Sequence, residues 1–152
     1  MDTDTHTRIL EGGCCCGRVH LAFTTATPPQ AFRPRACDCS FCSARGIRYV
    51  SDPHGSLLIE ADRPDTLREH RQGSRLAQFL LCRHCDQLIA VVFADGDRRY
   101  GTLNADCLHD RTLFPAPDTV SPGGIAAPED RVRRWTALWT PQVELRFPRA
   151  AS

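Results

Sequence analysis

The sequence predicts a mainly β domain with a short C-terminal helix, and three observations support this fold class. Apolar residues alternate with polar ones, or cluster, in short runs along the chain. Glycine, proline and aspartate separate these runs at close intervals, as turns do between short strands. Most of the nine cysteines stand in three tight clusters, a pattern typical of small folds that are stabilised by a bound metal ion.

The predicted strands are the apolar runs, and the predicted helix follows them. The strands are expected at 19–23, 47–50, 57–60, 77–81, 88–93 and 100–103. Segment 115–128 is rich in proline and glycine, which favours a long irregular loop. Within 130–139, Trp135 and Trp139 share one face at helical spacing, and Pro141 would end the helix. We expect both tryptophans to belong to the core.

The chain of 152 residues is long enough for one domain with a hydrophobic core. We place this domain at 9–149, after a disordered tail at 1–8. The N-terminus is polar and acidic, without the basic start and apolar run of a signal peptide. No apolar stretch approaches the roughly 20 residues that span a bilayer. A cytoplasmic location is therefore expected, where clustered cysteines indicate metal binding rather than disulfides.

Charge and composition exclude several classes of function. The formal net charge of +1 gives no indication of nucleic acid or a membrane as partner. The 19 basic residues are all arginine, which excludes Schiff-base catalysis by lysine. Arginine instead suits bidentate recognition of carboxylates.

Two of the cysteine clusters predict a closed metal site. In an extended Cys14-Cys15-Cys16 segment, the thiols of Cys14 and Cys16 would point the same way. Cys82 and Cys85 form a C-x-x-C turn, a common zinc-chelating arrangement. One pair from each end would place four thiolates around one zinc ion, and a fully ligated site of this type is structural.

The third cluster predicts a second zinc ion, in an open site. Cys37, Cys39 and Cys42 could occupy three corners of a tetrahedron, and no fourth cysteine stands nearby in the sequence. A corner left to water or substrate is typical of catalytic zinc. Other pairings of the seven ligands stay open from spacing alone.

The remaining cysteines are interpreted without a metal. Cys15 and Cys107 are expected to be buried free thiols that pack as small hydrophobic side chains. His84, inside the C-x-x-C turn, is expected to be an exposed turn residue rather than a ligand.

The motifs G-x-C-x-C-G, C-x-C-S-x-C and C-x-x-C, in this order, resemble those of the glutathione-dependent formaldehyde-activating enzyme family, which includes centromere protein V. The resemblance covers roughly 11–108. It implies small antiparallel sheets stapled by zinc, a β-tent fold shared with methionine-R-sulfoxide reductase. It also implies carbon–sulfur lyase activity, in which glutathione and formaldehyde give S-hydroxymethylglutathione. By motif position, the structural zinc ligands would be Cys14, Cys16, Cys82 and Cys85, and the catalytic zinc ligands Cys37, Cys39 and Cys42.

The chain departs from the family pattern at three positions. The family usually has histidine where this chain has Asp38, arginine where it has Ser43, and glycine where it has Asp86. The metal ligands are unchanged, so these departures concern the substrate. Asp38 is the nearest candidate for proton transfer, with His54 and His70 as weaker candidates.

A tripeptide thiol with two carboxylates would require cationic partners. Arg45 and Arg48 follow the middle cluster closely in the sequence, and we expect them to bind the substrate carboxylates.

The leading hypothesis is therefore a zinc-dependent carbon–sulfur lyase that joins glutathione, or another small thiol, to formaldehyde or a similar small aldehyde. The sequence leaves room for a homodimer. The alternative is a non-catalytic, zinc-stapled module that binds a protein partner. A sulfoxide reductase fits less well, because Gly101 stands where the nucleophilic cysteine of that enzyme is expected.

Overall fold

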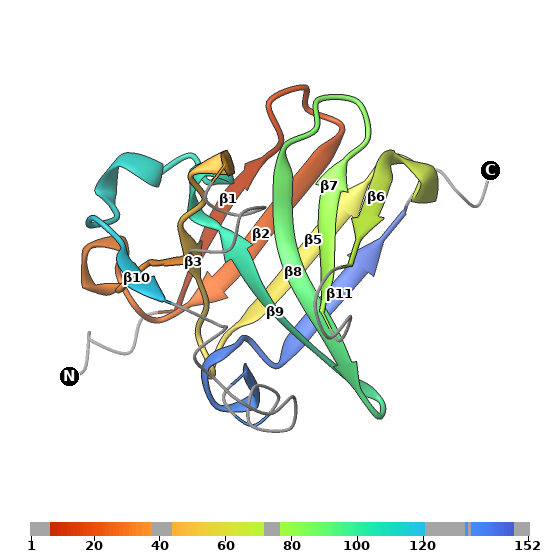
Figure 1. Ribbon diagram of the computed structural model, residues 1–152. Helices are drawn as coiled ribbons and strands as arrows, with labels where there is room; N and C mark the ends of the chain where they lie inside the picture. The colour runs from red at the N-terminus through yellow and green to blue at the C-terminus, as the bar shows by residue number, and fades with distance from the viewer. Residues whose placement is uncertain (1–6, 38–43, 72–76, 121–132, 134, 148–152) are drawn as a thin grey trace.

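The computed structural model describes residues 7–37, 44–71, 77–120, 133 and 135–147, which form two β-sheets (Figure 1). The first sheet has the strand order β1 (Arg8–Gly13), β2 (Val19–Thr25), β5 (Ser56–Ala61) and β11 (Gln142–Arg146). The second sheet has the order β10 (Asp118–Val120), β3 (Arg35–Cys37), β4 (Tyr49–Val50), β9 (Arg98–Asn104), β8 (Leu88–Asp95), β7 (Gln78–Cys82) and β6 (Leu67–His70). Short 3-10 helices lie in the connections: η2 (Pro29–Ala31), η3 (Pro64–Thr66), η4 (Ala105–Cys107) and η5 (Arg111–Leu113).

Most neighbouring strands are antiparallel, but each sheet contains one parallel pair. β1 and β2 form a hairpin, and β7, β8 and β9 form a meander. β11 runs parallel to β5, and β10 runs parallel to β3. The chain thus returns to complete the first sheet with β11 after it has built the second.

The larger hydrophobic core lies between the two sheets. Buried and more exposed residues alternate along β2 and β5, so Leu21, Phe23 and Ile59 point into this core. Ile89 and Val92 of β8 belong to the same core cluster. Strict alternation is typical of strands with one face on a core and the other toward solvent.

The opposite face of the second sheet carries a smaller aromatic cluster. The ring centroid of Phe93 lies 5.1 Å from that of Tyr100 and 5.5 Å from that of Trp139. Trp135 stacks on Trp139, with centroids 4.8 Å apart, and residues 135–138 are helical. The middle of β8 is therefore covered on both faces, which explains why its apolar run is unbroken.

The structure confirms the mainly β fold class, and each predicted strand region contains an observed strand. β1, β3, β6, β10 and β11 were not predicted from the sequence. Arg8, which was expected in the disordered tail, already belongs to β1. β10 lies inside the expected loop at 115–128, where it pairs with β3; positions 121–128 lie outside the described residues. The predicted helix is observed at 135–138, whereas 130–132 and 134 also lie outside the described part.

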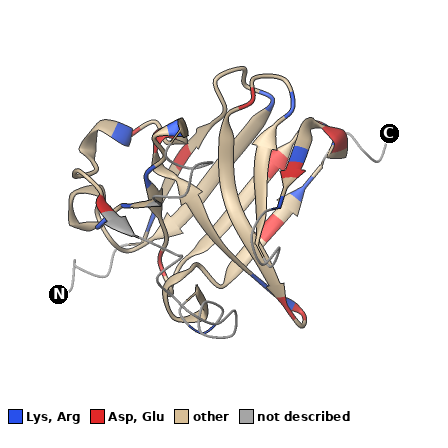
Figure 2. Cartoon of the chain, viewed as in Figure 1, with Lys and Arg blue, Asp and Glu red and all other residues tan. Residues whose placement is uncertain are grey.

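Charged residues lie mainly on the loops and toward the ends of strands, while β7, positions 88–94 of β8 and positions 100–104 of β9 carry none (Figure 2). β6, for example, presents Arg68 and Glu69 at the end of the sheet. Among the described residues, no helix is both long and apolar enough to cross a membrane.

Candidate metal centre

The first half of the candidate site is the turn between β1 and β2. The N–H of Gly17 donates to the carbonyl of Cys14, with N and O 3.1 Å apart, and the N–H of Cys14 donates to the carbonyl of Val19, also at 3.1 Å. Gly17 has a φ of 83°, a left-handed conformation that glycine adopts without strain. Cys14–Cys16 is therefore part of a tight turn, and the prediction of an extended segment is wrong.

The second half is the turn between β7 and β8. Cys82 ends β7, and its carbonyl accepts a hydrogen bond from the N–H of Asp86, with N and O 2.8 Å apart. The N–H of Cys82 donates to the carbonyl of Gln87 at 2.9 Å. Gln87 also links the two turns, because its side-chain Oε1 accepts from the N–H of Cys15 at 2.8 Å.

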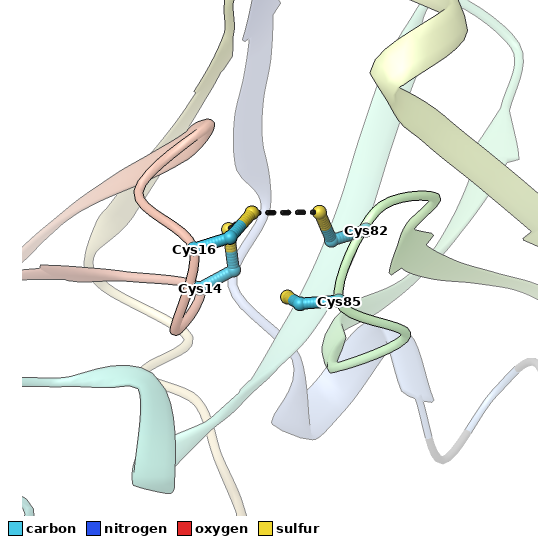
Figure 3. Close-up of side chains that lie close together, drawn as sticks. All are labelled: Cys14, Cys16, Cys82 and Cys85. Atoms are coloured by element: carbon cyan, nitrogen blue, oxygen red, sulfur yellow. Dashed lines mark hydrogen bonds between the residues drawn. The ribbon is translucent and has the colours of Figure 1, made fainter.

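The two turns bring four sulfur atoms together (Figure 3). The Sγ atoms of Cys14, Cys16, Cys82 and Cys85 all lie within 4.8 Å of one another. The Sγ of Cys16 is 3.5 Å from that of Cys14 and 3.5 Å from that of Cys82. Four sulfurs bound tetrahedrally to zinc at about 2.3 Å would be about 3.8 Å apart. The cluster could therefore hold one metal ion.

The backbone around these sulfurs favours their ionised form. The N–H of Val19 donates to the Sγ of Cys14, with the two atoms 3.3 Å apart. Backbone N–H groups also face the other three sulfurs: that of Arg18 faces Cys16, those of His84 and Cys85 face Cys82, and those of Cys16 and Gln87 face Cys85. N–H groups directed at a sulfur stabilise a thiolate and orient it toward a metal.

The metal-free thiols differ in their tendency to ionise. Burial raises the pKa of Cys82 to about 12, despite the nearby N–H groups. Burial also opposes ionisation of Cys85, but the N–H groups of Gln87 and Cys16 and the neighbouring thiols outweigh it and lower its pKa to about 6. Of these two thiols Cys85 ionises more readily, and a bound cation would favour ionisation of Cys82 as well.

The other two cysteines near this site differ from each other. Cys107 is buried, as predicted, and its thiol donates to the carbonyl of Leu88 with S and O 3.5 Å apart. Burial raises the pKa of Cys107, so this thiol stays neutral. Cys15 is exposed, which corrects the prediction of a buried thiol: the tight turn directs it outward. His84 is exposed, as predicted.

The glycines before Cys14 serve packing rather than metal binding. A Cβ on Gly12 would lie 2.0 Å from the carbonyl oxygen of Cys107. Gly12 also forms an isolated β-bridge with Leu108. The absence of a side chain at Gly12 lets the segment after β9 lie directly against β1.

The predicted open site falls largely outside the described residues. Cys37 is the last residue of β3, where its backbone is in register with Val120 of β10. Asp38, Cys39 and Cys42 lie outside the described part of the chain. The open three-thiolate site therefore stays a prediction.

The two arginines expected to bind substrate have partners within the chain. Arg48 Nη2 lies 2.6 Å from Asp106 Oδ1 and also donates to the carbonyl of Arg111 at 3.0 Å. Arg48 Nη1 donates to the carbonyls of Phe114 and Pro115. This guanidinium therefore holds the segment after β9 in place. Arg45 Nη2 lies 3.3 Å from Asp86 Oδ2, beside the C-x-x-C turn.

Sequence reasoning missed the role of Asp86, which also binds Arg68 of β6: Arg68 Nη2 lies 2.6 Å from Asp86 Oδ1. Among the described residues, Asp86 is the non-glycine residue with a positive φ, at 61°. An aspartate directly after a C-x-x-C turn, where the backbone turns left-handed, is the signal that could have indicated it.

The comparisons with known proteins bear on the fold. No protein-family model matches this chain, and no curated protein matches it. The structure is similar to the crystal structure of a Rhodobacter sphaeroides protein, a structural-genomics target, with a TM-score of 0.56 and 24% sequence identity. The match covers 72% of this chain and 99% of that chain. At this identity the likeness shows a shared fold alone. The chain is a mainly β domain, and its own four-cysteine cluster could bind a metal.

Proposed function

We propose that this chain is a zinc-dependent carbon–sulfur lyase similar to S-(hydroxymethyl)glutathione synthase, with a structural zinc at the four-cysteine cluster. One observation carries the proposal. The four cysteines that the family motifs assign to the structural metal lie within 4.8 Å of one another, although they come from two distant turns. This agreement supports the motif alignment, and through it the role proposed for the middle cluster.

The donor set of the four-cysteine cluster fits zinc well. Four thiolates at tetrahedral spacing are typical of structural zinc, and soft sulfur donors disfavour calcium and magnesium. Cys37, Cys39 and Cys42 would hold the second zinc ion. That ion would supply a soft Lewis acid, which favours the ionised form of a thiol brought to the open corner.

In the proposed reaction, the sulfur of glutathione adds to the carbonyl carbon of formaldehyde. The C–S bond forms as the C–O π bond breaks, and the oxygen gains the proton that the thiol has lost. Asp38 would carry this proton, because it stands between two of the proposed ligands. In the reverse direction the same carboxylate would accept the hydroxyl proton as the C–S bond breaks.

Cobalt substitution tests the proposal. The cobalt-loaded chain should show thiolate charge-transfer bands, and those of the middle site should shift when glutathione is added. The matched control is Cys42→Ser, which should lose the shift and keep the bands of the four-cysteine site. An unchanged wild-type spectrum at millimolar glutathione would reject the lyase and favour a zinc-stapled module that binds a protein partner.

A further inference from the structure

A bridge of three charged side chains lies beside the four-cysteine cluster. Asp86 directly follows Cys85, and its two carboxylate oxygens bind different arginines. Oδ1 lies 2.6 Å from Nη2 of Arg68, and Oδ2 lies 3.3 Å from Nη2 of Arg45. Arg68 belongs to β6, whereas Arg45 stands three positions after Cys42 in the sequence. Two segments far apart in the sequence therefore each direct a guanidinium group at the same carboxylate.

The backbone at Asp86 is left-handed, with a φ of 61°. Aspartate adopts this region more readily than most residues with a Cβ, and here its carboxylate lies between the two arginines. The turn itself does not depend on the carboxylate, because the N–H of Asp86 donates to the carbonyl of Cys82.

The bridge is accessible to solvent. Two guanidinium groups face one carboxylate, and each guanidinium carries several N–H donors suited to carboxylates. The Asp86 side chain is 62% exposed, and those of Arg45 and Arg68 are 28% and 38% exposed. Ion pairs this exposed contribute little to the free energy of folding. Replacement of the Asp86 carboxylate by a carboxylate of a ligand should therefore cost little free energy.

We propose that Arg45 and Arg68 form a binding site for a carboxylate of a small acidic thiol, and that Asp86 is the internal carboxylate which this ligand displaces. The thiol character of the ligand rests on the proposed function. Chain connectivity limits the Cα atoms of Cys42 and Arg45 to a separation of about 11 Å, whatever the path between them. A peptide thiol can span that distance. Its anchored sulfur would raise the effective concentration of its carboxylate at the arginines.

The experiment uses S-methylglutathione, whose blocked sulfur separates carboxylate binding from metal–thiol chemistry. Its affinity for the full-length, zinc-loaded chain is measured by calorimetry at low salt. Asp86→Asn should tighten binding about tenfold, because the internal competitor is lost while both arginines stay. Arg68→Gln added to Asp86→Asn should reverse the gain. Asparagine and glycine both tolerate the left-handed region, so Asp86→Gly should give the same gain.

The matched control is Asp118→Asn. Asp118 is 61% exposed and pairs with Arg33, with Arg33 Nη2 3.1 Å from Asp118 Oδ2, on another part of the surface. This substitution changes the net charge equally and should leave the affinity at the wild-type value. Equal affinity in the wild type and both Asp86 variants, or an equal gain in Asp118→Asn, would overturn the proposal. Tighter binding in the Asp86 variants without any cobalt response to glutathione would sustain this carboxylate site and reject the proposed reaction.

Discussion

The sulfur atoms of Cys82 and Cys16 are 3.5 Å apart, yet their surroundings differ. Cys82 is fully buried at the end of β7, whereas Cys16 is exposed in the β1–β2 turn. Without a metal, burial keeps the Cys82 thiol protonated, because a buried thiolate would have no cation to balance its charge. Binding of a metal resolves this conflict, and single ligands should therefore matter greatly to stability.

Cys82→Ser should lower the melting temperature by about 10–20 °C or leave the protein insoluble. Structural zinc contributes on the order of 10 kcal/mol in small peptides, and the net stability of a domain is only about 5–15 kcal/mol. Cys42→Ser is the matched control, because the middle cluster is local in sequence and closes no long loop. It should remain folded, with circular dichroism near the wild type. Calorimetry together with zinc analysis checks both variants; equal loss of stability in the two would contradict the division into structural and catalytic sites.

Gly12→Ala should destabilise the protein by about 2 kcal/mol or more. The new Cβ would meet the backbone oxygen of Cys107 at 2.0 Å, and backbone cannot move aside as a flexible side chain can. Gly96→Ala serves as the control, because its φ of 64° is unfavourable for alanine but its Cβ would meet open space. That control should cost about 1 kcal/mol. Urea unfolding measures both, and a smaller loss for Gly12→Ala than for Gly96→Ala would show that the contact is not rigid.

At the scale of residues, the sequence predicted the four-cysteine cluster because C-x-x-C and C-x-C spacings restrict where thiols can point. It mispredicted Cys15 because an alternating strand was assumed where the chain makes a tight turn. The expectation that Arg48 binds substrate rests on its proximity to the middle cluster in the sequence, and it stays a prediction. The ion pair with Asp106 depends on how the segment after β9 folds back, which no local pattern records.

At the scale of elements, three of the strands that were not predicted, β3, β6 and β10, are short or polar. β3 and β10 each have three residues, too few for a recognisable period. β6 has the sequence LREH and lies at the end of its sheet, where one neighbour suffices. β11 does alternate, with Val143 and Leu145 partly buried, but it pairs with β5 only after a separation of more than half the chain. Long-range parallel pairing leaves no signal in a short window.

Truncation after Thr140 should destabilise the protein and promote aggregation. It removes β11, exposes the edge of β5, and uncovers the core that Val143, Leu145 and Phe147 pack against. Truncation after Phe147 is the control, because it leaves every described strand pairing in place and should keep the melting temperature within about 2 °C of the wild type. Light scattering and calorimetry compare the two; a soluble, normally melting chain that ends at Thr140 would show that β11 is dispensable.

At the scale of the whole molecule, the metal would link the two sheets. Cys14 and Cys16 lie in a turn of the first sheet, and Cys82 and Cys85 lie in a turn of the second. A single ion at these turns would fix how the two faces of the main core approach each other. Removal of the metal should therefore loosen the packing between the two sheets more than it disturbs the strand pairing within each sheet.

Metal affinity should rise steeply with pH, because all four sulfurs must be thiolates to bind. The buried Cys82, with a pKa of about 12, and Cys16, whose pKa is also raised, are protonated at neutral pH. Each bound ion should therefore release at least two protons near pH 7. Below about pH 6 a further proton enters at Cys85, and affinity should fall more steeply. Competition with a chromophoric chelator across this range measures the slope, and a pH-independent affinity would exclude these thiols as the ligands.

The parallel pairing of β11 with β5 also sets an order of events during synthesis on the ribosome. β1, β2 and β5 leave the exit tunnel long before residue 142, so the outer edge of β5 stays unpaired while β6 to β10 of the second sheet are synthesised. That edge carries Leu57 and Ile59, whose side chains face the future core. The nascent chain is thus vulnerable to pairing with other strands until its final segment emerges. Slow translation of the last third of the message would prolong this exposure, and rapid translation there would shorten it.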